Sequence, residues 1–166
     1  MGQNPDCQIV PQIVLMTEQD VLSVVQLEVA CGLSSRGADA YLNALQQANS
    51  LLLIAVQQDS DGRQVLGIFS GDIVVDELQI DNVAVAMTSR RRGIGNALLN
   101  AALKQAQALG ACSGVLEVRA QNLAAVSLYE RVGFITVGRR KRYYQNPPDD
   151  ALILQCDLVK WHQNAA

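Results

Sequence analysis

The sequence has very little histidine and no paired cysteines. His162 is the single histidine in 166 residues, which disfavours Ser-His-Asp catalysis, Cys-His catalysis and metal sites with several histidine ligands. No two of the four cysteines form a C-x-x-C pair, and none has a zinc-ligand spacing. We therefore expect reduced thiols and no metal. The cysteines are Cys7, Cys31, Cys112 and Cys156.

Charge and long apolar runs are also scarce. Charged residues make up 17% of the chain, and 13 cations against 16 acids give a net charge of -3, which disfavours a general nucleic-acid binder. The longest apolar run, Leu51 to Val56, is far below the roughly 18 residues of a membrane span. The first residues resemble neither a signal peptide nor a myristoylation site. We expect a soluble, cytoplasmic protein that does not bind membranes.

The apolar periodicity predicts alternating strands and helices in the second half, and therefore an α/β fold with a mixed sheet. The length suits one domain over residues 1–166. Asp59 to Gly62 marks a hairpin turn, and Gly67 and Gly71 mark expected bulge sites. Strands are predicted at 9–15, 51–56, 65–75, 78–86, 115–118, 134–137 and 151–159, and helices at 17–32, 34–48, 93–109 and 123–132.

The segment Arg90 to Ala97 has the composition of an anion-binding loop. It follows a predicted strand and opens a long helix, so Gly93 and Gly95 allow main chain close to an anion and the first-turn amides supply positive potential. The clusters 90–92 and 139–142 hold seven of the 13 cations. The P-loop and dinucleotide motifs do not match. The segment alone is equally typical of a helix start with packing glycines and solvated arginines.

Further motifs follow this loop in order. The whole series resembles the GNAT N-acetyltransferase superfamily, and within it the ribosomal-protein alanine N-acetyltransferases of the RimI type. The resemblance covers residues 78–158 and implies the GNAT fold, a mixed, mostly antiparallel sheet of six or seven strands with about four helices. The motifs are Arg90-x-x-Gly93-x-Gly95, Leu116 to Asn122, Ala125 to Phe134, and Arg139 to Tyr144.

The resemblance implies an acetyl-CoA site on the loop and on the strand before it. In this family the loop and helix start bind the pyrophosphate, and the strand pairs with the pantetheine arm and directs an amide at the thioester oxygen, where a donor stabilises developing charge. A residue at the start of the next helix also contacts the cofactor. The implied residues are Val83, Ala84, Val85, Arg91, Arg92, Gly93, Ile94, Gly95, Asn96 and Asn122.

Glu117 interrupts the apolar strand 115–118. An unpaired charge buried there would cost several kcal/mol, so the carboxylate requires an explanation. The resemblance makes Glu117 the general base for the attacking amine, with burial raising its pKa toward the working range. Alternatively, Glu117 pairs with Arg119 or Arg131, or faces solvent.

Tyr129 lies on the following predicted helix. The resemblance makes it the general acid that protonates the departing CoA thiolate, and a phenol with a pKa near 10 can do this at modest cost. The alternative is a core tyrosine between Leu128 and Phe134. The resemblance also implies that Tyr143 or Tyr144 lines the acceptor channel. Alternatively, the segment with its four adjacent cations is only a solvated strand end.

The acceptor is predicted to be an amine that attacks directly in a ternary complex. An α-amine with a pKa near 8 is easier to deprotonate than a lysine near 10.4, by about 3.3 kcal/mol. This difference makes a protein N-terminus chemically reasonable without selecting it, and the resemblance to the ribosomal-protein alanine type is what favours it. The alternatives are a small amine, a lysine, or a non-catalytic acyl-CoA-binding module. The chain departs from the family at 86–89, where an Asp-Pro pair is usual, and lacks a tryptophan near the second helix.

Overall fold

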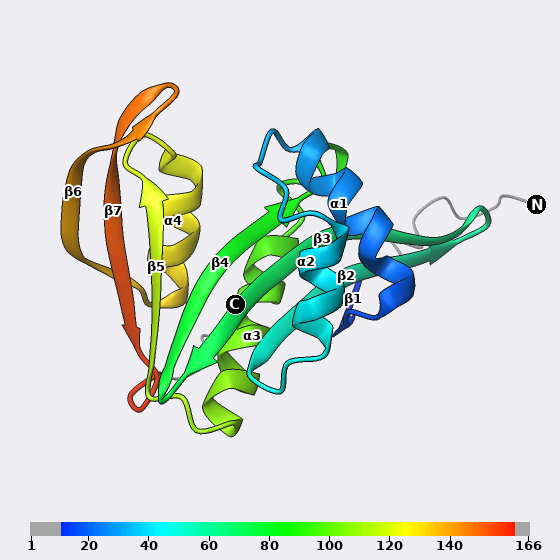
Figure 1. Cartoon of the computed structure of the whole chain (residues 1–166), viewed down its shortest axis with the longest axis horizontal. Helices are drawn as coiled ribbons and strands as arrows, with labels where there is room; N and C mark the ends of the chain where they lie inside the picture. Colours follow the sequence, from blue (N-terminus) through cyan, green and yellow to red (C-terminus); the bar gives the residue numbers. More distant parts are fainter. Residues whose placement is uncertain (1–10, 162–166) are drawn as a thin grey trace, which may run out of the picture.

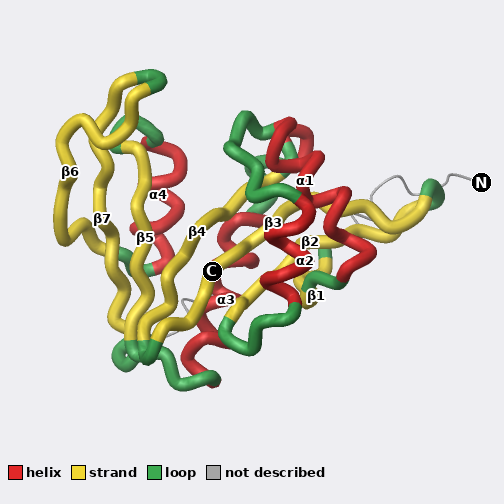
Figure 2. The backbone as a smooth tube through the Cα atoms, viewed as in Figure 1, coloured by secondary structure: helices red, strands yellow, loops and turns green. Residues whose placement is uncertain are grey.

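The fold is a single seven-stranded sheet flanked by helices (Figures 1 and 2). The computed structural model describes residues 11–161. The strand order is β1-β2-β3-β4-β5-β7-β6, and only the β4–β5 pair is parallel. The strands are β1 (Gln12–Leu15), β2 (Ser50–Asp59), β3 (Gly62–Val74), β4 (Glu77–Val85), β5 (Ser113–Arg119), β6 (Ile135–Gln145) and β7 (Pro148–Asp157), and the helices are α1 (Val21–Ala30), α2 (Ala38–Leu45), α3 (Ile94–Ala108) and α4 (Leu123–Val132).

The apolar segment of β2 explains why both faces of the sheet are covered. All six residues from Leu51 to Val56 are buried, and successive side chains of a strand point to opposite faces. Leu51, Leu53 and Ala55 pack with α3, whereas Leu52, Ile54 and Val56 pack with α1 and α2. In Figure 1, α1 and α2 accordingly lie in front of the sheet and α3 lies behind it.

Most predicted elements are present near their predicted positions. The 51–75 hairpin is confirmed, and register shifts occur beside Gly67 and at Gly71 as expected. Thr17 and Asp20 interact at the start of the first helical segment through a 2.9 Å bond from the Thr17 amide to the Asp20 carboxylate. The described chain therefore has a mixed, mostly antiparallel sheet of seven strands with four α-helices, which agrees with the prediction of six or seven strands and about four helices.

Several predicted boundaries differ from the observed ones, and two of these differences have a clear physical reason. The second helix begins at Ala38 rather than at Ser34 or Ser35, because Gly37 has a φ of 83° and its amide donates to Ser35 Oγ. The strand predicted at 134–137 continues to Gln145, since its polar residues pair with β7 at the sheet edge. An edge strand that is exposed along most of its length has no apolar alternation to reveal it.

The parallel pair β4–β5 separates part-way along and forms a fork. Their pairing ends at Ile80 opposite Leu116, although both strands continue. On the other side of β4, Ser70 pairs with Asn82 and Gly71 with Ile80, so Asp81 is an extra, bulged residue. A bulge bends its strand and increases its twist. The bulge therefore directs the end of β4 away from β5, and the two strands diverge in Figure 1.

Several sequence expectations concern the chain termini. His162 and Cys7 lie outside the described residues. Trp161 is packed, and its indole N–H donates to the Val132 carbonyl at 2.9 Å. Within residues 11–161, no helix is long and apolar enough to cross a bilayer. The same residues contain no group of three or more His, Cys, Asp or Glu side chains placed to hold a metal ion.

Candidate active site

The loop before α3 adopts the conformation that exposes helix-start amides. Arg91 and Gly93 both have positive φ values, 64° and 77°, and no side chain caps the helix at Gly93. The amides of the first α3 turn, at residues 94–96, lack intrahelical acceptors and lie at the positive end of the helix dipole. This geometry fits a phosphate or another anion.

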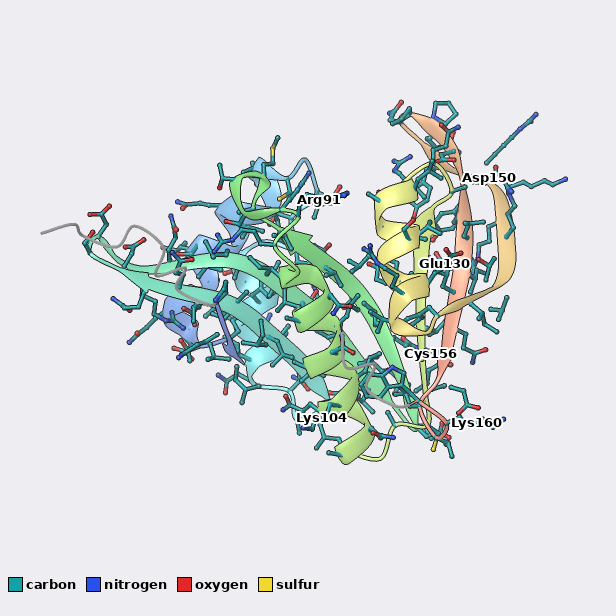
Figure 3. All side chains as sticks on the ribbon, turned by 180° about the vertical axis from the view of Figure 1, so that it is seen from behind. Arg91, Lys104, Glu130, Asp150, Cys156 and Lys160 are labelled. Carbon is teal, nitrogen blue, oxygen red and sulfur yellow. The ribbon has the colours of Figure 1, made fainter. Side chains whose placement is uncertain are left out.

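Gly95 allows α4 to approach α3 closely. A Cβ atom at Gly95 would lie 3.1 Å from Leu128 Cδ2, a contact that would force the neighbouring side chain to move. The glycine is therefore a packing requirement between the two helices, in addition to any role toward an anion. Figure 3 shows α3 and α4 side by side on this face of the sheet, with Arg91 just before α3.

A cleft of about 890 Å³ lies between β4, α3 and α4. It is lined by nine of the ten residues predicted to bind the cofactor; the exception is Arg92. The Arg92 guanidinium instead donates to Gln57 Oε1 at 3.2 Å. The nine are Val83, Ala84, Val85, Arg91, Gly93, Ile94, Gly95, Asn96 and Asn122.

The cleft also contains residues that the sequence analysis did not select. Arg131 and Leu128 line it together with Ala125 and Asn122, and their spacing of three residues places them on one face of α4. This spacing is the sequence signal from which Arg131 could have been predicted to line the cleft. Asn122 additionally caps α4 by accepting a bond from the Ala125 amide at 3.2 Å.

Asn100 is a further unpredicted residue of the cleft. It is buried, and its Nδ2 donates to the Asn96 carbonyl at 2.8 Å, while its Oδ1 has no partner. Buried polar atoms are usually hydrogen-bonded. The unpartnered Oδ1 is an acceptor, so it can bind a hydrogen-bond donor of a ligand, such as an amide N–H or a hydroxyl group, but not an anion.

The predicted burial of Glu117 was wrong. Its side chain retains 30% exposure and forms an ion pair with Arg140 Nη2 at 3.1 Å. Leu116 and Val118 face the α3–α4 core, so the alternation of β5 turns Glu117 to the opposite face of the sheet. The carboxylate is the first β5 residue beyond the last pair with β4. The position of Glu117 at the fork, rather than its burial, therefore explains why this strand contains a charged residue.

Tyr129 is buried in the α3–α4 core and does not line the cleft. Its ring packs edge-on against Phe134 at 5.8 Å between centroids, so the expected core packing is present. Burial, and to a lesser degree Tyr144, raises the pKa of Tyr129 to about 12. The phenol is therefore held in its protonated form.

Tyr144 lies within electrostatic reach of both predicted catalytic residues. Burial raises the pKa of Tyr144, and the Glu117 charge contributes next, while Tyr144 in turn raises the pKa of Tyr129. Glu117 and Tyr129 nevertheless lie on opposite faces of the sheet, and neither is among the residues that line the cleft. The resemblance implies that one thioester reaches both groups, and this stays a prediction.

The cations at 139–142 are partly engaged within the β6–β7 hairpin. Arg139 pairs with Asp150 at 2.6 Å, and Arg140 pairs with Glu117. Tyr143 and Tyr144 pack edge-on at 5.2 Å, and Arg119 lies over the Tyr144 ring at 4.1 Å. The cluster is therefore not simply a solvated strand end, because its Arg140 forms an ion pair with Glu117, the predicted general base.

Residues 22–134 match the Acetyltransferase (GNAT) family. The chain belongs to this family. A [Ribosomal protein bS18]-alanine N-acetyltransferase of Escherichia coli is 38% identical over 84 residues, covering 49% of this GNAT chain and 57% of that protein. A Haemophilus ducreyi protein of the same name is 33% identical over 132 residues, covering 80% of the chain and 88% of the relative.

A solved structure extends this similarity to nearly the whole GNAT domain. The crystal structure of the ribosomal-protein-S18-alanine N-acetyltransferase from Escherichia coli has a TM-score of 0.80 at 25% identity, over 94% of this chain and 99% of that one. The RimI-type resemblance inferred from the motifs is thereby confirmed.

Proposed function

We propose that this protein transfers acetyl from acetyl-CoA to the N-terminal amine of a protein, and that the acceptor is of the ribosomal-protein alanine type. One observation carries the proposal: nine residues predicted for the cofactor line one cleft, and its β4 residues follow the fork at which Glu117 begins the unpaired part of β5. The similarity to [ribosomal protein bS18]-alanine N-acetyltransferases supports the choice of acceptor. The described residues 11–161 act as one catalytic domain.

The cleft holds acetyl-CoA by its diphosphate and its pantetheine arm. The α3 first-turn amides and Arg91 bind the diphosphate, because anions are favoured at a helix start. Val83 to Val85 offer main-chain groups to the arm, since β4 has no β5 partner there. Asn122 lies across the cleft at the start of α4. This arrangement directs the thioester into the fork.

The reaction then proceeds in a ternary complex. The neutral amine attacks the thioester carbon, a C–N bond forms and the C–S bond breaks. The amine proton passes to Glu117, directly or through water, and the Tyr129 phenol proton passes to the CoA thiolate. The oxygen charge of the intermediate is stabilised by a β4 amide near Val83. No covalent acyl-enzyme and no metal are required.

The test is acetylation of a peptide that begins with alanine, followed by mass spectrometry. We expect a 1:1 N-terminal acetyl product with acetyl-CoA. Glu117→Gln and Tyr129→Phe should each lower the rate by about 10²-fold, the usual scale of acid–base catalysis, while CoA binding survives. Glu130→Gln, an exposed carboxylate on α4, is the matched control.

Acceptor panels separate the remaining possibilities. Acetylation of polyamines or internal lysines in preference to the peptide would replace the proposed acceptor. CoA binding without turnover of any amine would indicate a non-catalytic acyl-CoA-binding module. Full activity in both variants would refute the acid–base assignment.

A further inference from the structure

The β4 bulge is held from α1 and from the segment that follows α1. Arg36 Nη1 contacts Asp81 Oδ2 at 3.1 Å, and Asn82 Nδ2 donates to Glu28 Oε1 at 2.9 Å. Both β4 residues lie beyond Ile80, where pairing with β5 ends. α1 and the segment that follows it thus contact the two residues that open the fork.

Glu28 is an unusual residue to find at this position. It is 0% exposed, and its Oε1 accepts hydrogen bonds from Tyr41 Oη at 2.5 Å and from Asn82. Its Oε2 has no hydrogen-bond partner, and within residues 11–161 Glu28 takes part in no salt bridge. Burial of such a group costs free energy. Packing alone would be served better by an apolar side chain, so the carboxylate requires a functional explanation.

A carboxylate that only accepts hydrogen bonds determines which way a neighbouring amide is turned. Because Glu28 accepts a hydrogen bond from Asn82 Nδ2, the Oδ1 atom of the same amide is turned away from Glu28. Within the described chain, Asn82 Oδ1 has no protein hydrogen-bond partner. Asn82 is half-buried and directly precedes Val83 of the cleft. An oriented hydrogen-bond acceptor is thus presented next to the cofactor strand.

Asn82 and Glu117 lie on the same face of the sheet and on opposite arms of the fork. Asn82 contacts Glu28 of α1, on the α1–α2 face, and Glu117 is turned to that face by the alternation of β5. The last β4–β5 pair, Ile80 with Leu116, lies just before both residues. A group entering from this face meets a hydrogen-bond acceptor on each strand.

We infer that Glu28 is a positioning residue that turns the Asn82 amide so that Asn82 Oδ1 accepts a hydrogen bond from the acceptor amine. The inference rests on the proposed function, because it specifies the amine-binding part of that site. An attacking amine carries N–H donors, and two acceptors at the fork direct its lone pair toward the thioester. Asn82 holds the amine, and Glu117 takes its proton.

The test uses steady-state kinetics with three variants: Glu28→Gln, Asn82→Asp and the double variant. In Glu28→Gln either end of the new amide can face Asn82, so the orientation is lost. Asn82→Asp sets two carboxylates against each other. In the double variant the amide introduced at position 28 can donate to the carboxylate introduced at position 82, which again presents an oxygen to the fork.

We expect each single variant to lower kcat/KM for the acceptor peptide by about tenfold, the scale of one lost hydrogen bond. The Kd for CoA should change less than about twofold, since the diphosphate site is separate. The double variant should regain most of the kcat/KM that Asn82→Asp alone loses. Glu130→Gln, the same change at an exposed site on α4, should match the wild type.

Two results would overturn the inference. The first is a parallel loss of melting temperature, CoA affinity and activity in the single variants, with no recovery in the double variant. That result would indicate a structural role only. The other is single variants with unchanged kcat/KM.

A wild type that turns over no amine would refute the proposed function instead. In that case the NMR signal of the Asn82 side-chain amide decides the inference. A shift on addition of the peptide, absent in Glu28→Gln, would support it, and no shift would overturn it.

Discussion

At the scale of single residues, the two predicted catalytic groups have opposite environments. Tyr129 is buried and protonated, whereas Glu117 is partly exposed and paired with Arg140. Burial disfavours the phenolate anion, so Tyr129 stays protonated, but the raised pKa makes transfer of its proton to a thiolate more costly. A proton acceptor at an open fork remains accessible to an amine or a bridging water. The exposed environment of Glu117 is consistent with the role proposed for it.

The phenol titration of Tyr129 should reflect its burial. Its pKa in the folded protein is raised to about 12, against an ordinary value near 10. Because the folded value is the higher one, its contribution to stability is fully present below pH 10 and is lost as the pH rises through about 12. Ultraviolet difference titration of the wild type against Tyr129→Phe should show one late-ionising phenol. A Tyr129 phenol that ionises near pH 10 would contradict this environment.

The Glu117–Arg140 ion pair should contribute little to stability. The two side chains are 30% and 55% exposed, and pairs of this kind typically contribute about 0 to 1 kcal/mol. Urea unfolding of Arg140→Gln should therefore differ from the wild type by less than about 1 kcal/mol. A larger loss would mean that the pair supports the β6–β7 hairpin, rather than only engaging the carboxylate.

At the scale of elements, the two ends of α3 allow a matched comparison. Gly93 at its start and Gly110 after its end have φ values of 77° and 94°, and a Cβ at either would meet no atom within 4 Å. Alanine at either position should cost about 1 to 2 kcal/mol from backbone strain alone.

Only the change at Gly93 should also weaken binding of CoA. In Gly93→Ala the strain falls on the loop that presents amides to the diphosphate, so calorimetry should give a Kd raised about tenfold. In Gly110→Ala the stability loss should be similar and the Kd unchanged. Equal effects of both variants on the Kd would remove the α3 start from the binding site.

At the scale of the whole molecule, the cleft lies between two parts of the sheet that are joined by few pairs. Four register pairs, from Glu77 with Ser113 to Ile80 with Leu116, connect β4 to β5. A ligand lying along the unpaired part contacts β4 and α3 on one side and α4 on the other. Binding should therefore stabilise the folded chain as a whole.

Thermal unfolding checks that expectation. At a CoA concentration of 100 times its Kd, binding should raise the free energy of unfolding by about 2.7 kcal/mol. For a chain of this size that corresponds to an increase in Tm of roughly 5 to 10 °C. Adenosine, which lacks the diphosphate, should give little shift at the same concentration. An unchanged Tm with saturating CoA would contradict the assigned cleft.

Local signals in the sequence were sufficient for most elements and for the anion loop. The all-apolar 51–56 run, the hairpin turn and Gly93 act within a few residues of the chain, so their consequences were predictable. Gly95 instead packs against Leu128 of α4, which is distant in the chain. The polar edge strand 135–145 was not, because its order comes from pairing with β7 rather than from its own pattern.

The tertiary structure alone decided how the site is assembled. The sequence determined that a carboxylate follows Leu116 and that a basic run precedes Tyr143, but their pairing, Glu117 with Arg140, depends on strands that are far apart in the chain. The contact between Glu28 and Asn82 spans 54 positions. Whether a charge is buried, paired or exposed depends on which neighbours the folded sheet supplies, and one-dimensional periodicity specifies only the face on which a residue lies.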